Sequence, residues 1–292
     1  MMSVDLRAVT VEDAEPIRVI WQEAVTAGML DGFNASDVDM LVDRLPIHPE
    51  GIFVAVSEGD VAGFLHADAH LLVVQSENRR MGIGRKLVDF AERSLIESTG
   101  ERLLLWLPDG VEGAAAFYSS LGMRHSGSLW QLNLSPERYV PPPVLPEGIE
   151  ARSIDEVDLD EYVRLFNTAF AGHPTPLQIT REIVDWAKSR PGYDPSMTLV
   201  LAERSSGKLI GMCRSAHDHG PGEAGEVKFI GLLPEWRGKG LGKALLAWGV
   251  HRVAAAGAIG AQLNVEGEND GPLALYEQMG FVRAREWRRF GR

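Results

Sequence analysis

Residues 237–242, Arg-Gly-Lys-Gly-Leu-Gly, lie between an apolar strand-like run and an amphipathic helical pattern. Glycines let the backbone approach a ligand closely, and the N–H groups at the start of a helix face an anion together with the positive end of the helix dipole. The spacing therefore predicts a pyrophosphate site built largely from backbone groups. An ordinary strand-to-helix turn is the alternative interpretation.

A shorter copy of this segment occurs at residues 79–84, Arg-Arg-Met-Gly-Ile-Gly, and both copies fit Arg-x-x-Gly-x-Gly. Further residues recur at the same separation of 158 positions, which indicates an internal repeat. The matched pairs are Gly82 with Gly240, Gly84 with Gly242, Tyr118 with Tyr276, and Gly122 with Gly280.

The length and composition allow two domains, since 292 residues with 45% hydrophobic content can bury two cores. We expect an N-terminal domain at residues 1–135, a proline-rich linker at 136–148 and a C-terminal domain at 149–292. In each half the pattern predicts the order strand, helix, strands, helix, strand, helix, strand, which is a mixed α/β fold. Hairpins are expected at residues 53–65 and 199–213, and a terminal strand with alternate solvated side chains at 283–289.

The charge and cysteine content limit the partners and the location. A net charge of −12 argues against nucleic acid binding, and no apolar run of about 20 residues predicts a membrane span. The single cysteine, Cys213, excludes an intramolecular disulfide. With no signal peptide pattern at the start, we expect a cytoplasmic protein.

Both glycine motifs resemble the main CoA-binding motif of the GNAT superfamily of acyl-CoA-dependent N-acyltransferases. The run Asn269-x6-Tyr276-x3-Gly280-Phe281 is similar to the last helix-to-strand passage of that family. The resemblance implies two tandem GNAT-like domains forming an internal pseudo-dimer, and acetyl-CoA as co-substrate without a metal.

Acyl transfer from a thioester to an amine requires a deprotonated amine, a stabilised oxyanion and protonation of the thiolate. By resemblance, Glu226 is the general base and Tyr276 the general acid near the CoA sulfur. A solvated carboxylate at a strand end is the alternative for Glu226, and a packed aromatic ring is the alternative for Tyr276.

The resemblance also implies which residues contact CoA, with the oxyanion held by backbone N–H groups of residues 230–232. In the second half the predicted contacts are Ile230, Gly231, Leu232, Arg237, Gly238, Lys239, Gly240, Leu241, Gly242, Lys243 and Asn269. In the first half they are Leu72, Val73, Val74, Arg80, Met81, Gly82, Ile83, Gly84 and Arg85.

The first half lacks ten residues that precede Glu226 in the second half. The separation of 158 places Asp68 at the position of Glu226, and Val111 at that of Asn269. We therefore predict that the second half catalyses, while the first half either binds CoA or serves as a scaffold.

Among tandem members, the second half most resembles the mycothiol synthase family, through residues 167–174, Asn-Thr-Ala-Phe-Ala-Gly-His-Pro, and residues 225–227. That family acetylates the cysteinyl amine of a glucosaminyl-inositol conjugate. Three positions depart from its pattern, namely Thr175, Ala216 and Asn264. We count His173, Thr175 and Asn264 as candidate substrate contacts, although His173 before a proline is also typical of a turn.

Three functions follow from these observations. The leading hypothesis is a monomeric N-acetyltransferase with a small-molecule amine acceptor, and mycothiol synthase is the specific alternative. A non-catalytic acyl-CoA sensor is the alternative from another class, but a sensor needs neither proton-transfer residue. His217, Asp218 and His219 lack a third ligand at a convincing spacing, so no metal site is predicted there.

Overall fold

The computed structural model describes residues 4–30, 35–46, 49–108, 111, 113–173, 177–217 and 223–292. The chain forms two compact units. Unit 1 comprises Met1–Leu129 and Glu286–Arg292, and unit 2 comprises Trp130–Arg285. Within the described part of the chain, no helix is both long and apolar enough to cross a membrane.

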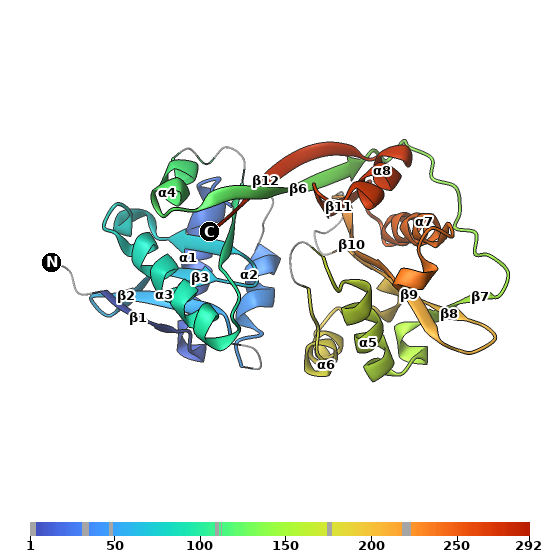
Figure 1. The fold of residues 1–292 in the computed structure, drawn as a ribbon, viewed down its shortest axis with the longest axis horizontal. Helices are drawn as coiled ribbons and strands as arrows, with labels where there is room; N and C mark the ends of the chain where they lie inside the picture. The colour runs from blue at the N-terminus through green and yellow to red at the C-terminus, as the bar shows by residue number, and fades with distance from the viewer. Residues whose placement is uncertain are drawn as a thin grey trace. The chain divides into compact units, whose positions relative to one another are not determined.

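Unit 1 is a layered α/β unit (Figure 1) whose first four strands form the antiparallel order β1-β2-β3-β4. The predicted hairpin at residues 53–65 is confirmed as β2 and β3, joined by Glu58 and Gly59 in left-handed conformations. The elements are β1 Val4–Ala8, α1 Ala14–Thr26, α2 Ala35–Val42, β2 Ile52–Ser57, β3 Asp60–His66, β4 Leu71–Val74, α3 Ile83–Ser98, β5 Leu104–Pro108, α4 Ala114–Ser120 and β6 Arg124–Leu134.

Successive residues of β4 point to opposite faces of this sheet, as in any strand. Leu71 and Val73 are buried with α1 and α2 in one core cluster. Leu72 and Val74 pack against a second cluster that contains α3. The sheet of unit 1 therefore separates two cores, and α1 and α3 lie on opposite faces (Figure 1).

Unit 2 repeats this plan with the strand order β6-β11-β10-β9-β8-β7. The core of α7 and α8 lies on one face, and the core of α5 and α6 lies on the other. Helix α5 begins where Asp158 accepts a hydrogen bond from the Glu161 N–H at 2.9 Å. The elements are β7 Ile149–Ser153, α5 Leu159–Ala169, α6 Arg181–Ser189, β8 Thr198–Glu203, β9 Leu209–Ala216, β10 Gly225–Leu232, α7 Leu241–Ala255, β11 Ala261–Glu266, α8 Asp270–Gln278 and β12 Val282–Gly291.

Each unit also contains the end of a strand from the other half of the sequence. In unit 1, β12 pairs antiparallel with β5 from Trp287 opposite Pro108 to Gly291 opposite Leu104. In unit 2, residues 130–134 of β6 belong to the sheet beside β11. Phe290 of β12 is buried in the α3 core, so this pairing completes the hydrophobic core of unit 1.

The terminal strand predicted at residues 283–289 is confirmed as β12. The prediction that its alternate side chains are solvated is only partly correct. Arg283 is exposed, whereas Arg289 is buried. The Arg289 guanidinium lies 5.7 Å from the Trp106 ring centroid, and its Nη2 donates to the Ser126 carbonyl oxygen at 3.1 Å. Arg289 is buried because this end of β12 belongs to unit 1, where a cation can stack on an aromatic face.

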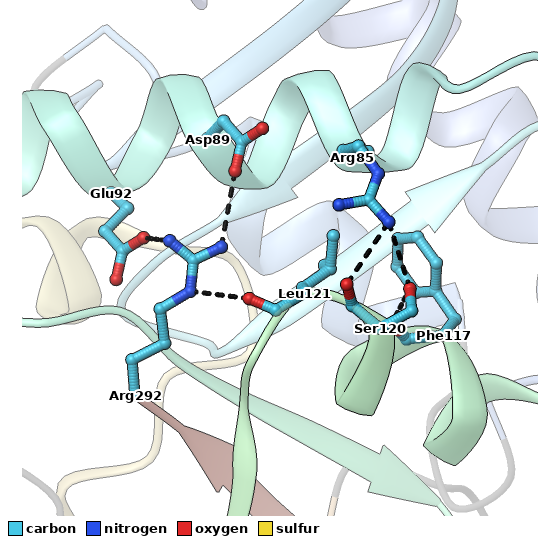
Figure 2. A network of polar contacts seen from close by, with 7 residues as sticks. All are labelled: Arg85, Asp89, Glu92, Phe117, Ser120, Leu121 and Arg292. Carbon is cyan, nitrogen blue, oxygen red and sulfur yellow. Dashed lines mark hydrogen bonds and ion pairs between the residues drawn. The ribbon is translucent and has the colours of Figure 1, made fainter.

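Arg292 follows β12 and joins three parts of unit 1 (Figure 2). Its guanidinium is hydrogen bonded to Glu92, lies 3.3 Å from Asp89 and donates through Nε to the Leu121 carbonyl oxygen at 2.8 Å. Glu92 is buried, so the guanidinium compensates a carboxylate removed from water. In Figure 2, Arg85 in the first turn of α3 similarly reaches Ser120 at the end of α4, at 3.1 Å from its Oγ.

Replacing Arg292 tests this attachment. Arg292→Ala leaves the buried Glu92 carboxylate without its guanidinium, so we expect unit 1 to lose about 1–3 kcal/mol of unfolding free energy. The measurement is urea unfolding. Lys208→Ala is the control, because its ion pair with Glu235 is exposed on both sides and its loss costs less than about 1 kcal/mol. Equal losses from the two substitutions would contradict this role for Arg292.

Candidate functional site

The candidate site of unit 2 begins where two parallel strands stop pairing. Strands β10 and β11 pair through Gly225 with Ala261 and Glu226 with Gln262. Beyond these residues, no further pair between β10 and β11 is found in the described part of the chain. Strand β10 continues to Leu232, and β11 continues to Glu266. The backbone of β10 is also irregular between Val227 and Phe229. The result is a gap in the sheet beside the predicted oxyanion segment at residues 230–232.

The glycine loop that follows β10 has the same backbone conformation as the loop that follows β4. A 3-10 turn precedes each one, at Pro234–Trp236 and Ser76–Asn78. Arg237 and Arg79 are both extended, with φ/ψ of −70°/158° and −72°/159°. The repeat found in the sequence is therefore a repeat of local geometry.

Left-handed residues recur at matched positions of the two loops. Gly240 has φ 80° and Gly82 has φ 82°. Two positions earlier in the loop, Gly238 has φ 73° while Arg80 has φ 63°. Arginine rarely adopts this conformation because of its Cβ, so the first half keeps the backbone path at a cost in strain.

Both loops lead into a helix whose first N–H groups have no intrahelical acceptor. The first helical bonds run from Ala244 N to Gly240 O and from Lys86 N to Gly82 O. The preceding N–H groups face the end of the helix and suit an anion. A Cβ built on Gly238 or Gly240 would meet nothing within 4 Å, so the space above the loop is open. These features fit the pyrophosphate of a CoA.

The candidate base, Glu226, lies at the last position of β10 that pairs with β11, and its polar neighbours include Asn264 and Lys228. Asn264 on β11 donates from Nδ2 to Glu226 Oε1 at 3.2 Å. Lys228 Nζ lies 3.7 Å from Glu226 Oε2. The structure thus joins Asn264, predicted as a substrate contact, to the carboxylate itself.

The candidate acid, Tyr276, lies on α8 and is buried in the core that contains α7. Burial raises the pKa of its phenol. The phenol therefore stays protonated at neutral pH, the state that a general acid needs. Its counterpart Tyr118 is also buried, with a pKa raised by burial, and its hydroxyl lies 3.5 Å from the Trp106 carbonyl oxygen.

The candidate base and the candidate phosphate loop lie on different faces of the sheet. Val227, Leu263 and Val265 point into the α7 core. By strand alternation, Glu226 and Asn264 face the other side, where α5 and α6 lie. A ligand held at the start of α7 must therefore pass through the gap between β10 and β11 to reach Glu226.

Unit 1 has a cavity of about 510 Å³ beside β4 and its glycine loop, the elements that match β10 and its loop in unit 2. This is a typical size for a ligand site. Its walls include all the predicted first-half contacts except Met81. The lining also includes residues that the sequence analysis missed, among them Arg79, Trp106 and Phe117. The separation of 158 could have identified Arg79 through Arg237, and Phe117 directly precedes the repeated Tyr118, whereas Trp106 carried no motif.

Some of the predicted site residues form hydrogen bonds within unit 2 itself. The Arg237 guanidinium donates to the carbonyl oxygens of Ala169 at 2.8 Å and Leu232 at 3.3 Å, so it ties the loop to α5 and β10. His173 lies in a turn, with its N–H bonded to the Phe170 carbonyl oxygen at 3.0 Å. Asn269 precedes α8, and its side chain does not cap the helix.

Other predicted residues lie outside the described part of the chain. These are Thr175, Asp218 and His219. Among the described residues no group of three or more His, Cys, Asp or Glu side chains is arranged to hold a metal ion. Lys228 is a further residue that the sequence analysis did not single out, and only its distance from Glu226 identifies it.

Comparison with protein families assigns both halves to one type of domain. Residues 159–281 match the model of the acetyltransferase (GNAT) family. Residues 48–124 match the model of an acetyltransferase (GNAT) domain.

Several curated proteins similar to the chain are mycothiol acetyltransferases. A mycothiol acetyltransferase of Streptomyces griseus subsp. griseus is 34% identical over 250 residues, which cover 80% of this chain and 78% of that protein. A mycothiol acetyltransferase of Streptomyces coelicolor is 31% identical over 291 residues, covering 95% and 91%.

Solved structures support the tandem fold. A GCN5-related N-acetyltransferase from Sphaerobacter thermophilus has a TM-score of 0.65 at 22% identity, covering 99% of this chain and 95% of that one. A tandem GNAT protein from the clavulanic acid biosynthesis pathway has a TM-score of 0.65 at 18% identity, covering 99% and 98%. These likenesses show the fold.

Beside the cavity of unit 1, His70 makes the folded unit sensitive to acid. Its ring lies 6.1 Å from the Trp106 ring, and burial lowers its pKa to about 4. Unfolded, this histidine takes up a proton near pH 6.5, which the folded unit resists. The unfolding free energy is therefore not reduced by His70 above pH 6.5. It falls as the pH drops towards 4, by up to roughly 3 kcal/mol.

The substitution His70→Asn tests this dependence, because asparagine tolerates the left-handed conformation at this position, φ 54°. We expect the acid loss of unfolding free energy between pH 6.5 and 4.5 to shrink in the variant. Urea unfolding at several pH values measures it, with the exposed His125→Asn as control. An unchanged slope in His70→Asn would show that another group causes the acid loss.

Proposed function

Because the chain belongs to the GNAT family of N-acetyltransferases, we propose that its second half transfers an acetyl group from acetyl-CoA to the amine of a small molecule. GNAT acetyltransferases use acetyl-CoA as co-substrate, and the thioester supplies the activated acetyl group. The observation that carries the proposal is the gap between β10 and β11, which has the glycine loop on one face and Glu226 on the other.

In the proposed mechanism, backbone N–H groups at the start of α7 hold the pyrophosphate. Glu226 accepts a proton from the ammonium group of the acceptor, directly or through a water, and frees the amine. The free amine attacks the thioester carbon, and backbone N–H groups of residues 230–232 stabilise the oxyanion that forms. The carbon–sulfur bond then breaks, Tyr276 protonates the departing thiolate, and the proton released by the new amide nitrogen restores the Tyr276 phenol.

Asn264 positions the base in this mechanism. Its amide donates to Glu226 Oε1 at 3.2 Å and so fixes the orientation of the carboxylate. Lys228 places a positive charge 3.7 Å from the other oxygen. Both contacts come from strands rather than loops, which favours a fixed geometry at the base.

For the first half we propose CoA binding without catalysis. Its loop reproduces the backbone conformation of the second loop, and its cavity opens beside it. The position of Glu226 carries Asp68, which lies in the turn before β4 and does not line the cavity. The apparatus for holding a nucleotide is therefore kept, while the base is not in a comparable place.

Matched substitutions in the two halves test which half catalyses. We expect Glu226→Gln to lower kcat by about 100-fold or more, because a general base contributes about that factor, and Asp68→Asn to leave kcat within about twofold. The measurement is CoA thiol release from acetyl-CoA with a reactive amine. Equal loss from both variants would overturn the assignment of catalysis to the second half.

The acceptor that we propose is the cysteinyl amine of the glucosaminyl-inositol conjugate on which mycothiol synthases act. The support is the shared name of relatives at 30–34% identity over most of the chain. Thr175, Ala216 and Asn264 depart from the pattern of that family, so the acceptor requires its own test.

A panel of amines decides the acceptor. We expect kcat/KM for the cysteinyl-glucosaminyl-inositol conjugate to exceed that for free cysteine and for glucosamine by at least about 100-fold, because the larger acceptor offers more contacts in the transition state. The Glu226→Gln variant gives the background rate of CoA thiol release for each amine. A higher kcat/KM for another amine would reassign the acceptor and leave the reaction in place.

A further inference from the structure

The cavity of unit 1 passes through the sheet. Its lining includes Leu72 and Val74, which face the α3 core, and also Leu71 and Val73, which face the α1 core. The lining also includes Ala24 and Leu30 of the α1 core and Ile83 of the α3 core, so the cavity reaches both faces of the sheet. The crossing lies between β4 and β5, which belong to different sheets in the strand order.

The two ends of this cavity differ in chemistry. On the α3 side it meets the glycine loop, including Gly82, Gly84 and Arg85. On the α1 side the described lining residues are apolar, and the indole N–H of the tryptophan is their one polar side-chain group. Asp68 does not line the cavity. This apolar end is lined by Ala24, Met29, Leu30, Leu71, Val73 and Trp106.

In unit 2, the matching face of the sheet, which carries α5, is polar beside the gap rather than apolar. Beside the gap between β10 and β11 it carries Glu226, Lys228 and Asn264, which suit a polar amine. A CoA held by the loop of α3, with its arm in the gap of unit 1, directs its thioester towards the apolar end instead. An acetyl group would leave most of that apolar surface without a partner.

We infer that the first half binds an acyl-CoA with an apolar chain of about four to eight carbons in preference to acetyl-CoA. The inference rests on the proposed function, in which the first half binds CoA. Each further methylene that enters the apolar end strengthens binding by up to about fourfold. The first half is then a site for a second class of thioester, separate from the acetyl-CoA of the reaction.

The test uses the full chain with the second-half site closed by Gly242→Leu. A Cβ at Gly242 already lies 3.5 Å from Leu275, so a larger side chain fills the space beside the loop. Affinities for CoA, acetyl-CoA, butyryl-CoA, hexanoyl-CoA and octanoyl-CoA are measured by calorimetry. We expect hexanoyl-CoA to bind at least tenfold more tightly than acetyl-CoA.

Two variants assign that preference to the cavity. Met29→Glu places a carboxylate at the apolar end on a partly exposed residue, and we expect it to remove the preference while CoA affinity stays within about twofold. Gly84→Leu, at the position matching Gly242, closes the loop end in the Gly242→Leu background and should abolish all binding. Thermal unfolding confirms that each variant is folded.

The outcomes separate this inference from the proposed function. Equal affinity for acetyl-CoA and hexanoyl-CoA would overturn the inference and leave CoA binding by the first half in place. No binding of any thioester to folded Gly242→Leu protein would overturn both. A preference for hexanoyl-CoA that survives Met29→Glu would also contradict the inference, because the chain would then lie elsewhere.

Discussion

The structure of the candidate site depends on a parallel pair of strands that stops pairing. Strands β10 and β11 are joined at Glu226 and Gln262 and then continue apart. Unpaired backbone groups inside a protein are costly, so a gap of this kind needs a partner to satisfy it. A ligand with amide groups along an extended arm suits that need, and the glycine loop beside the gap suits the charged end of such a ligand.

The two halves share this backbone arrangement while their side chains have diverged. Both loops have an extended arginine followed by a left-handed residue, although the first half uses Arg80 where the second uses Gly238. The strain at Arg80 indicates that the path of the loop matters more than the identity of the residue. Side chains differ most on the opposite face, where the second half has Glu226 with Asn264 and the first half has apolar residues.

Much of the fold followed from local patterns in the sequence. Alternation, the separation of 158 positions and the turn residues predicted both hairpins, the terminal strand and the two glycine loops, because these depend on neighbouring residues. The partner of the terminal strand could not be predicted, since alternation indicates a strand without indicating what it pairs with. For the same reason, the burial of Arg289 beside Trp106 and the contact between Asn264 and Glu226 had no signal in the sequence.

If each half holds a CoA through its glycine loop and the adjoining gap, the intact chain binds two CoA molecules. Native mass spectrometry measures this stoichiometry. We expect two CoA molecules per chain, and one in either of the matched variants Gly84→Leu and Gly242→Leu. A single CoA that is lost in one variant and unchanged in the other would contradict it.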